Sequence, residues 1–301
     1  MTDVIRTAQL TKYYGRRRGL DGLDLEVRSG EVYGFLGPNG AGKTTTIRLL
    51  LDLIHPTSGT ATVLGTEPRA GGAALRSRIG YLPGDFIVDG GQTGRVLLTH
   101  LGHLRGGVPK ASITALADRF DLDLQARIGS LSKGNRQKIG IVQAFMHRPE
   151  LLILDEPTGG LDPIMQQRFL DLVREVRASG LTVFMSSHVL SEVQQSADRV
   201  GIVRDGRLIA VEAVDDLRRR AVRRVEIHFD EPVSSEAFVS IPELREVRVE
   251  DSVLRARLAG RADALVKAAA RYPVASLVVE EPDLEELFFT YYGGEEATDA
   301  A

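Results

Sequence analysis

The chain has no cysteine among its 301 residues, which excludes disulfide frameworks, thiol nucleophiles and cysteine-rich zinc sites. Long apolar runs are also absent: the runs at 49–51, 151–154 and 182–185 are far shorter than the ~20 apolar residues that a membrane helix requires. The first residues lack the charged start, apolar stretch and small-residue cleavage site of a signal peptide. We therefore expect the chain to stay in the cytoplasm and to meet a membrane only through a partner.

A strong net charge is missing as well. The formal charge of −3 provides no global field for nucleic acid, whose binding depends largely on neutralising phosphates with Lys and Arg, so no nucleic-acid partner is expected. Hydrophobic residues make up 43% and charged residues 26%, which is typical of a soluble globular protein. At roughly 150 residues per domain, the length predicts two domains.

The order of apolar patterns predicts an α/β core. A helix is expected from Lys43 to about Leu53, and residues 86–150 are expected to form a mostly helical insertion, with Ile139, Val142 and Met146 at helical spacing. Short apolar runs followed by polar loop residues are typical of strands buried on both faces of a parallel sheet. Strands are predicted at 4–10, 23–27, 32–36, 151–154 and 182–185.

The first domain is predicted to span 1–212. It ends after Asp205-Gly206, which lies between two apolar stretches and is a strong hairpin signal. Beyond a basic link at 218–220, a small α+β domain is predicted over 218–301. Its strands are expected at 224–229, 246–250, 253–258 and 275–280, and its helices at 262–271 and 283–292.

A glycine-rich segment follows the strand predicted at 32–36 and precedes the helix predicted from Lys43. It fits G-x-x-x-x-G-K-[ST], so its backbone N–H groups are expected to wrap phosphates while Lys43 reaches the β/γ oxygens and Thr44 offers a hydroxyl to Mg²⁺. The alternative is a glycine-rich turn that arose by chance. The predicted ATP-binding residues of this loop are Gly37, Pro38, Asn39, Gly40, Ala41, Gly42, Lys43, Thr44 and Thr45.

Two acids end the strand predicted at 151–154. Beside a phosphate-binding loop, Asp155 is expected to anchor Mg²⁺ through its hydration shell, and Glu156 is expected to face and activate an attacking water. Without that loop, the pair would be read equally well as helix caps or solvated charges. The metal residues predicted are therefore Thr44 and Asp155, and the predicted catalytic residues include Glu156 and Lys43.

The segment that contains Leu131, Ser132, Lys133, Gly134 and Asn135 resembles the signature sequence of ABC ATPases. Ser132 is expected to cap the following helix, and Gly134 to leave its N–H open to an anion; the alternative is an ordinary N-cap with nothing bound. The family has Gln more often than Asn at position 135. The resemblance covers about residues 4–212 and implies a P-loop NTPase core with an antiparallel β subdomain and the helical insertion.

The resemblance also assigns three further residues. Asp162 matches the D-loop, and His188 matches the switch histidine that contacts the γ-phosphate, although a lone His after a strand is more often structural. Tyr14 stands where the family places an aromatic that stacks on adenine, with Tyr13 as the neighbour that could be confused with it. Arg16, Arg17 and Arg18 are expected to form a solvated loop.

One feature departs from the family pattern. Members usually carry Gln after the strand expected at 79–83, where it helps to coordinate Mg²⁺ and links the site to the membrane partner, but this chain has Gly84-Asp85. Mg²⁺ would then keep an extra water or take the Asp85 carboxylate. As an isolated Asp after Pro83-Gly84, Asp85 is predicted to be a turn residue, and the metal to keep a water.

The resemblance implies an ATP- and Mg²⁺-dependent ATPase subunit that forms a homodimer on binding ATP and powers export through separate polytopic membrane subunits. We expect a peripheral position on the cytoplasmic face of a bacterial plasma membrane. The stretch from Glu281 to Phe288, followed by Tyr291-Tyr292-Gly293, is similar to the ending of bacterial drug and antibiotic exporter ATPases; the alternative is an amphipathic closing helix. The C-terminal domain is expected to regulate or dimerise. The alternative function is a non-transport ABC ATPase acting on nucleic acid or ribosomes.

Overall fold

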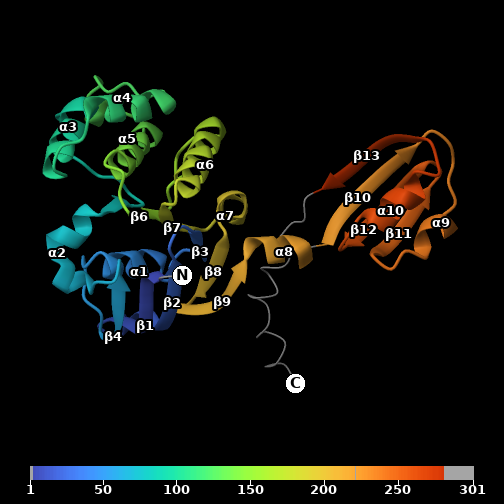
Figure 1. The fold of residues 1–301 in the computed structure, drawn as a ribbon, viewed down its shortest axis with the longest axis horizontal. Coiled ribbons are helices and arrows are strands. Elements are labelled where there is room, and N and C mark those ends of the chain that lie inside the picture. The colour runs from blue at the N-terminus through green and yellow to red at the C-terminus, as the bar shows by residue number, and fades with distance from the viewer. Residues whose placement is uncertain (1–2, 221, 281–301) are drawn as a thin grey trace. The chain divides into compact units, whose positions relative to one another are not determined.

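A computed structural model describes residues 3–220 and 222–280 of the chain (Figure 1). The chain divides into two compact units at Glu212. None of the helices in the described residues is both long and apolar enough to cross a membrane.

The first unit is built on a six-stranded sheet in the order β5-β6-β7-β3-β8-β9. Its strands from β5 to β8 pair in parallel, whereas Asp205 and Gly206, both with positive φ, join the last two in a hairpin, as predicted. Because the register pairs Leu36 with Ser187 and Asp155 with Ser186, the carboxyl ends of β3, β6 and β7 meet at one edge. The strands are β3 (Val32–Leu36), β5 (Ile79–Leu82), β6 (Leu151–Asp155), β7 (Thr182–Ser187), β8 (Arg199–Arg204) and β9 (Arg207–Ala213).

A second, antiparallel sheet covers one face of the first unit's core. It has the order β2-β1-β4 and consists of β1 (Asp3–Tyr14), β2 (Arg17–Arg28) and β4 (Ser58–Val63). Helix α1 (Lys43–Leu50) contacts both sheets, and Ile47 and Leu50 are fully buried in one cluster with Leu25 and Phe35. The predicted antiparallel β subdomain is confirmed.

Helices pack on the opposite face of the parallel sheet. Leu152 and Leu154 of β6 point to this face and join Ile141 and Phe169, while Leu151 and Ile153 join the other core, so the strand is buried on both faces as its apolar sequence predicts. The helical insertion lies above this sheet in Figure 1. Helix α2 (Pro68–Ser77) instead contacts β4 and β5, and its Leu75 joins the core shared with the antiparallel sheet. The other helices of this unit are α3 (Gly94–Leu104), α4 (Lys110–Arg119), α5 (Lys133–Phe145), α6 (Pro163–Ala178) and α7 (Leu190–Ser196), with a 3₁₀ turn at Ile128–Ser130.

Helix α1 is shorter than the sequence predicts. It ends at Leu50, because Asp52 takes a left-handed conformation with φ of 56°. The N–H of Leu53 then donates to the Arg48 carbonyl and the N–H of Asp52 to the Leu49 carbonyl, which is the Schellman pattern of helix termination. A left-handed Asp is an uncommon terminator, and no Gly or Pro marks the position.

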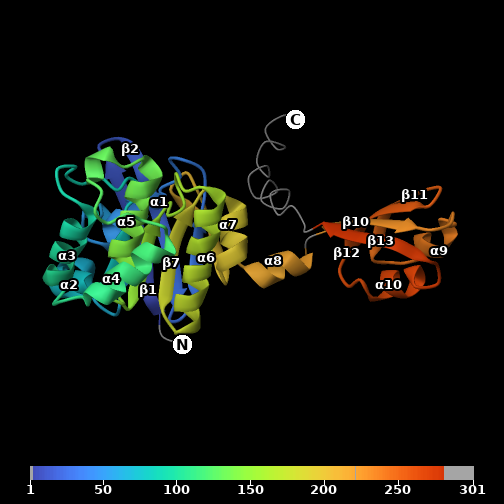
Figure 2. The same ribbon diagram turned by 90° about the horizontal axis from the view of Figure 1, so that it is seen from above.

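The second unit is a four-stranded antiparallel sheet in the order β11-β12-β10-β13, with two helices on one face (Figure 2). Ile227, Phe229, Phe238, Leu254 and Leu265 form its core. Its basic link is not a loop but the end of a helix, and the helix predicted at 283–292 lies outside the described residues. The elements are α8 (Val214–Arg220), β10 (Val222–Phe229), α9 (Glu236–Val239), β11 (Leu244–Glu250), β12 (Val253–Ala259), α10 (Asp263–Ala269) and β13 (Val274–Glu280).

Candidate nucleotide site

The glycine-rich loop connects β3 to α1. Gly42 begins the helix with φ of 109°, and a Cβ there would lie 2.8 Å from the Gly19 carbonyl oxygen, so only glycine fits. Lys43 follows as the first helical residue and is only 6% exposed; its Nζ donates to the carbonyl oxygens of Gly37 at 2.6 Å and Pro38 at 3.2 Å. The loop thus holds a buried cation at a helix N-terminus, an arrangement suited to phosphate.

A hollow of about 530 Å³, the P-loop hollow, opens beside this loop. Gly37 and Ala41 do not line it: a Cβ at Gly37 would meet the Val203 carbonyl oxygen at 2.3 Å, and Ala41 is buried beneath the loop. The hollow is lined by Tyr14 but not by Tyr13, as the sequence comparison expects. The predicted ATP-binding residues that line it are Tyr14, Pro38, Asn39, Gly40, Gly42, Lys43, Thr44 and Thr45.

Three arginines line the P-loop hollow that the sequence interpretation did not select. Arg17 and Arg18 were expected in a solvated loop, but they belong to strand β2, whose start pairs with Tyr14 across the β1–β2 turn. Arg48 reaches the hollow from α1. Their only sequence signal was adjacency to Tyr14 and to the glycine-rich loop, and they make the mouth of the hollow cationic.

The two carboxylates at the end of β6 have different surroundings. Asp155 is 2% exposed, and its oxygens accept hydrogen bonds from Thr44 Oγ1 at 2.8 Å and Ser186 Oγ at 2.6 Å. Burial, with a smaller effect of the nearby Asp155 charge, raises the pKa of Tyr81 to about 12, so this phenol stays protonated at neutral pH.

Glu156 brings together the predicted catalytic residues. Its Oε1 lies 3.1 Å from Lys43 Nζ and its Oε2 lies 2.5 Å from His188 Nδ1. These three side chains come from α1, the end of β6 and the end of β7, which the parallel register places at one edge. Glu156 also has a positive φ of 47°, which is unusual for a non-glycine residue and aims its side chain from a sharp turn.

Ser186 is a site residue that sequence reasoning missed. Besides its bond to Asp155, its fully buried hydroxyl accepts a hydrogen bond from the Glu156 N–H at 3.1 Å. It therefore fixes the side chain of one acid and the backbone of the next. The serine pair before His188 was the available signal in the sequence. Only the pairing of β6 with β7 shows that Ser186 lies beside Asp155.

The departure from the family pattern leaves a gap beside Asp155. A Cβ built on Gly84 would lie 3.5 Å from Asp155 Oδ2, so position 84 is where a longer side chain would reach the acid. Asp85 instead points to the surface: its side chain is 77% exposed and lies 3.8 Å from Lys133 Nζ.

The signature residues lie at the start of α5, away from the lining of the P-loop hollow. Ser132 caps the helix as predicted, accepting a hydrogen bond from the Asn135 N–H at 3.2 Å. A Cβ on Gly134 would meet the Gly160 carbonyl oxygen at 2.4 Å, so the helix start fits closely against the following loop. Asp162 caps α6 in the same way, through Met165 N–H at 3.0 Å. Within the described residues, none of the five signature residues lines the hollow.

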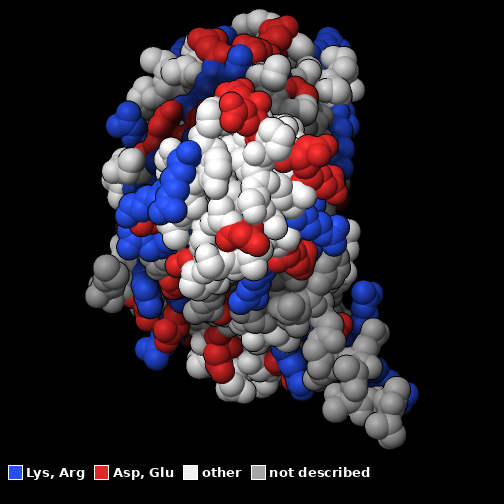
Figure 3. Space-filling model, turned by 90° about the vertical axis from the view of Figure 1, so that its right-hand side faces the viewer, with Lys and Arg blue, Asp and Glu red and all other residues white. Residues whose placement is uncertain are grey.

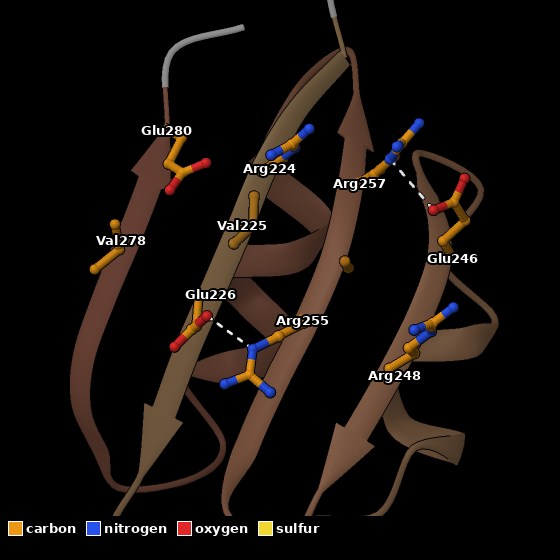
Figure 4. Close-up of a pocket in the computed structure, with 10 residues that line it drawn as sticks. Arg224, Val225, Glu226, Glu246, Arg248, Arg255, Arg257, Val278 and Glu280 are labelled. Atoms are coloured by element: carbon orange, nitrogen blue, oxygen red, sulfur yellow. Dashed lines mark hydrogen bonds and ion pairs between the residues drawn. The ribbon is translucent and has the colours of Figure 1, made fainter. Parts of the chain in front are cut away.

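A second hollow, of about 540 Å³, lies on the open face of the C-terminal sheet (Figure 4). Strand alternation places Arg and Glu side chains on this face, and they pair with one another: Arg255 with Glu226 at 2.8 Å and Arg257 with Glu246 at 3.3 Å. Figure 3 likewise shows both charge signs interspersed around an uncharged area on one face of the molecule. The hollow carries no phosphate-binding loop, so the P-loop hollow is the candidate site.

Comparison with known proteins also supports a nucleotide site at the P-loop hollow. Residues 20–159 match the family model described as ABC transporter. The bacitracin transport ATP-binding protein BcrA of Bacillus licheniformis is 38% identical over 237 residues, which cover 77% of this chain and 76% of that protein. The linearmycin resistance ATP-binding protein LnrL of Bacillus subtilis is 31% identical over 96% of this chain and 98% of its own. A solved ATP-binding subunit of an ABC transporter superposes with a TM-score of 0.66 at 30% identity, covering 72% of this chain and 92% of that one.

Proposed function

The chain belongs to the ABC transporter family as an ATP-binding subunit of an exporter, and from that premise we propose how its own residues hydrolyse ATP. Lys43, Glu156 and His188 support this role, because three separate elements bring Lys43 and His188 within hydrogen-bond reach of Glu156. Lys43 and the loop N–H groups hold the β- and γ-phosphates. His188 contacts the γ-phosphate on the side away from Lys43. Tyr14 stacks on adenine.

Glu156 acts as the general base. Its carboxylate takes a proton from the attacking water as that oxygen bonds to the γ-phosphorus, while the bond from the γ-phosphorus to the bridging oxygen breaks and ADP leaves. Lys43 and His188 orient the carboxylate, one at each oxygen.

Mg²⁺ fits the oxygen atoms next to this base. Thr44 Oγ1 and Asp155 Oδ2, 2.8 Å apart, are the hard ligands that Mg²⁺ prefers, and the ion ordinarily keeps several waters besides. Thr44 and Asp155 would hold it, Asp155 through water. When bound, the ion neutralises charge on the phosphates. The gap at Gly84 leaves room for a further water.

A second copy of the chain completes the site. ABC cassettes dimerise and work with membrane subunits. Since Ser132 and Gly134 lie at the N-terminus of a helix that does not line the chain's own P-loop hollow, we assign them to the γ-phosphate held by the partner copy. Two copies then close on two ATP molecules, with Asp162 at the contact between them.

The cargo we propose is an antibiotic-like or lipid-like compound, carried by separate polytopic membrane subunits with this chain at their cytoplasmic face. The names of the bacitracin and linearmycin relatives support this class. The rival function, an ABC ATPase acting on nucleic acid or ribosomes, usually involves a long coiled-coil insertion. Within the described residues the longest helix is α6, at 16 residues, which favours transport. Affinity capture from a native membrane extract tests this: recovery of ribosomes or nucleic acid without a polytopic membrane protein would favour the rival.

Replacing Glu156 by Gln tests the catalytic assignment. The variant is expected to bind ATP but to lose about 10²–10⁴-fold in turnover, because the amide cannot take the proton. Gel filtration with ATP and Mg²⁺ is expected to show a trapped dimer. A variant that hydrolyses ATP at near wild-type rate would remove Glu156 from this role.

A further inference from the structure

Glu192 is a buried acid that the chemistry above does not use. It lies on the short helix α7 and is 9% exposed. Its Oε1 accepts a hydrogen bond from Thr158 Oγ1 at 2.5 Å, and its Oε2 accepts one from Ser187 Oγ at 2.8 Å. Both carboxylate oxygens therefore have a hydroxyl donor, and bonds of this kind to an ionised acceptor are stronger than neutral ones.

The two hydroxyls belong to the segments that carry the catalytic pair: Thr158 lies in the loop after β6, and Ser187 is the last residue of β7. Thr158 lies two residues after Glu156, and Ser187 immediately precedes His188. Both are buried, and Ser187 Oγ also accepts a hydrogen bond from the Val189 N–H at 2.9 Å, on the far side of His188. One carboxylate thus connects the segment after the base to the backbone on either side of the histidine.

Helix α7, which carries Glu192, is tightly packed against the parallel sheet. Val193 is fully buried and packs against β3 so closely that a Cβ on Gly34 would lie 2.3 Å from its Cγ1. Ser196 Oγ donates to the Glu192 carbonyl oxygen at 2.8 Å, a bond within the helix that does not involve the Glu192 carboxylate. A displacement of either segment must therefore stretch a bond to Glu192 rather than move the helix.

We propose that Glu192 is a positioning residue that sets the distance between Glu156 and His188. Burial gives its two bonds their strength, because Thr158 and Ser187 are shielded from bulk water and lie in a medium of low dielectric constant. His188 is half exposed and makes its contact with Glu156 at 2.5 Å, so its position depends on the loop that follows Ser187. The inference rests on the proposed roles of Glu156 and His188.

Steady-state ATP hydrolysis by the full chain tests the connection. Glu192→Ala is expected to lower kcat by about 10- to 100-fold while KM changes less than about threefold, because base and histidine separate but the phosphate-binding loop is untouched. Glu192→Gln keeps the shape, accepts one hydroxyl through its oxygen and donates to the other through its NH₂. It is expected to stay within about threefold of wild type in kcat.

Two comparisons separate positioning from simple stabilisation. Ser196→Ala removes another buried hydrogen bond on the same helix without cutting the connection, and kcat is expected to stay at the wild-type value. Thr158→Val is expected to lower kcat in the wild-type chain but to add almost nothing in the Glu192→Ala background, since Glu192→Ala has already removed the Thr158–Glu192 bond. If Glu192→Ala does not fold, Thr158→Val and Ser187→Ala each still remove one of the two hydrogen bonds to the Glu192 carboxylate.

The outcomes distinguish this inference from the proposed function. An unchanged kcat in folded Glu192→Ala and Thr158→Val, with Glu156→Gln inactive, overturns the inference and leaves the function standing. Additive losses for the Thr158–Glu192 pair, or equal losses for Ser196→Ala, also overturn it. An active Glu156→Gln variant instead refutes the proposed function itself.

Discussion

At the scale of single residues, the site is unusual at position 84. Gly84 has no side chain to reach the metal, and the next residue, Asp85, lies at the surface near Lys133 rather than near Asp155. An exposed ion pair of this kind contributes little to stability. The geometry favours a water, not Asp85, as the replacement for the usual glutamine.

We therefore predict that Asp85→Ala barely changes the Mg²⁺ dependence of ATP hydrolysis. Thr44→Ala is expected to raise the Mg²⁺ concentration for half-maximal rate by about tenfold or more, and Asp85→Ala by less than about twofold. Titrating both variants with Mg²⁺ at fixed ATP makes the comparison. A larger rightward shift for Asp85→Ala would make Asp85 a substitute ligand.

At the scale of secondary-structure elements, two helix starts in the helical insertion have the same chemistry and different positions. Ser132 caps α5 and Thr93 caps α3, each accepting a hydrogen bond from the N–H three residues later. Only the first cap lies in the signature. The two therefore form a matched pair for separating helix stability from nucleotide contact.

Replacing either cap by Ala is predicted to lower the free energy of unfolding by about 1 kcal/mol. Only Ser132→Ala is expected to weaken ATP-dependent dimerisation, because its hydroxyl and the α5 N-terminus face the partner's nucleotide in the proposed dimer. Urea denaturation and gel filtration with ATP, both in the Glu156→Gln background, provide the two readouts. Equal effects of Ser132→Ala and Thr93→Ala on dimerisation would contradict the assignment of the signature.

At the scale of the whole molecule, the two units have separate cores. The clusters that contain Phe35 and Phe169 draw only on the first unit, and the cluster around Phe238 draws only on the second. The P-loop hollow is lined by first-unit residues alone. We therefore expect nucleotide binding not to depend on the C-terminal sheet, for which we propose a role in dimerisation or regulation.

A chain that stops after Arg220 keeps α8, whose Val214 and Leu217 are buried. It is predicted to bind ATP within about threefold of the full chain, since distant sites act almost independently. Dimerisation or coupling to the membrane partner is expected to change. Fluorescent-nucleotide titration and gel filtration measure the two properties. Loss of nucleotide binding in a folded truncated chain would show that the units depend on each other.

Much of the fold was predictable from local patterns. The strand at Val32–Leu36, the helix start at Lys43 and the hairpin at Asp205-Gly206 each have a signal within a few residues, because glycine, apolar runs and capping residues act locally. The end of α1 at Leu50 and the helical link at Val214–Arg220 were missed. A left-handed Asp and a charged helix carry weak local signals that tertiary context overrides.

The sequence by itself determined the residues that we propose to bind phosphate and accept a proton, because the loop before Lys43 and the pair Asp155 and Glu156 are each contiguous in the chain. Only the tertiary structure decided which other side chains lie next to them. Ser186 and Glu192 form hydrogen bonds to residues about 30 positions away, Arg17 and Arg18 line the hollow through a sheet pairing, and Asp85 lies at the surface near Lys133. Such contacts depend on strand order and register, which no local pattern encodes.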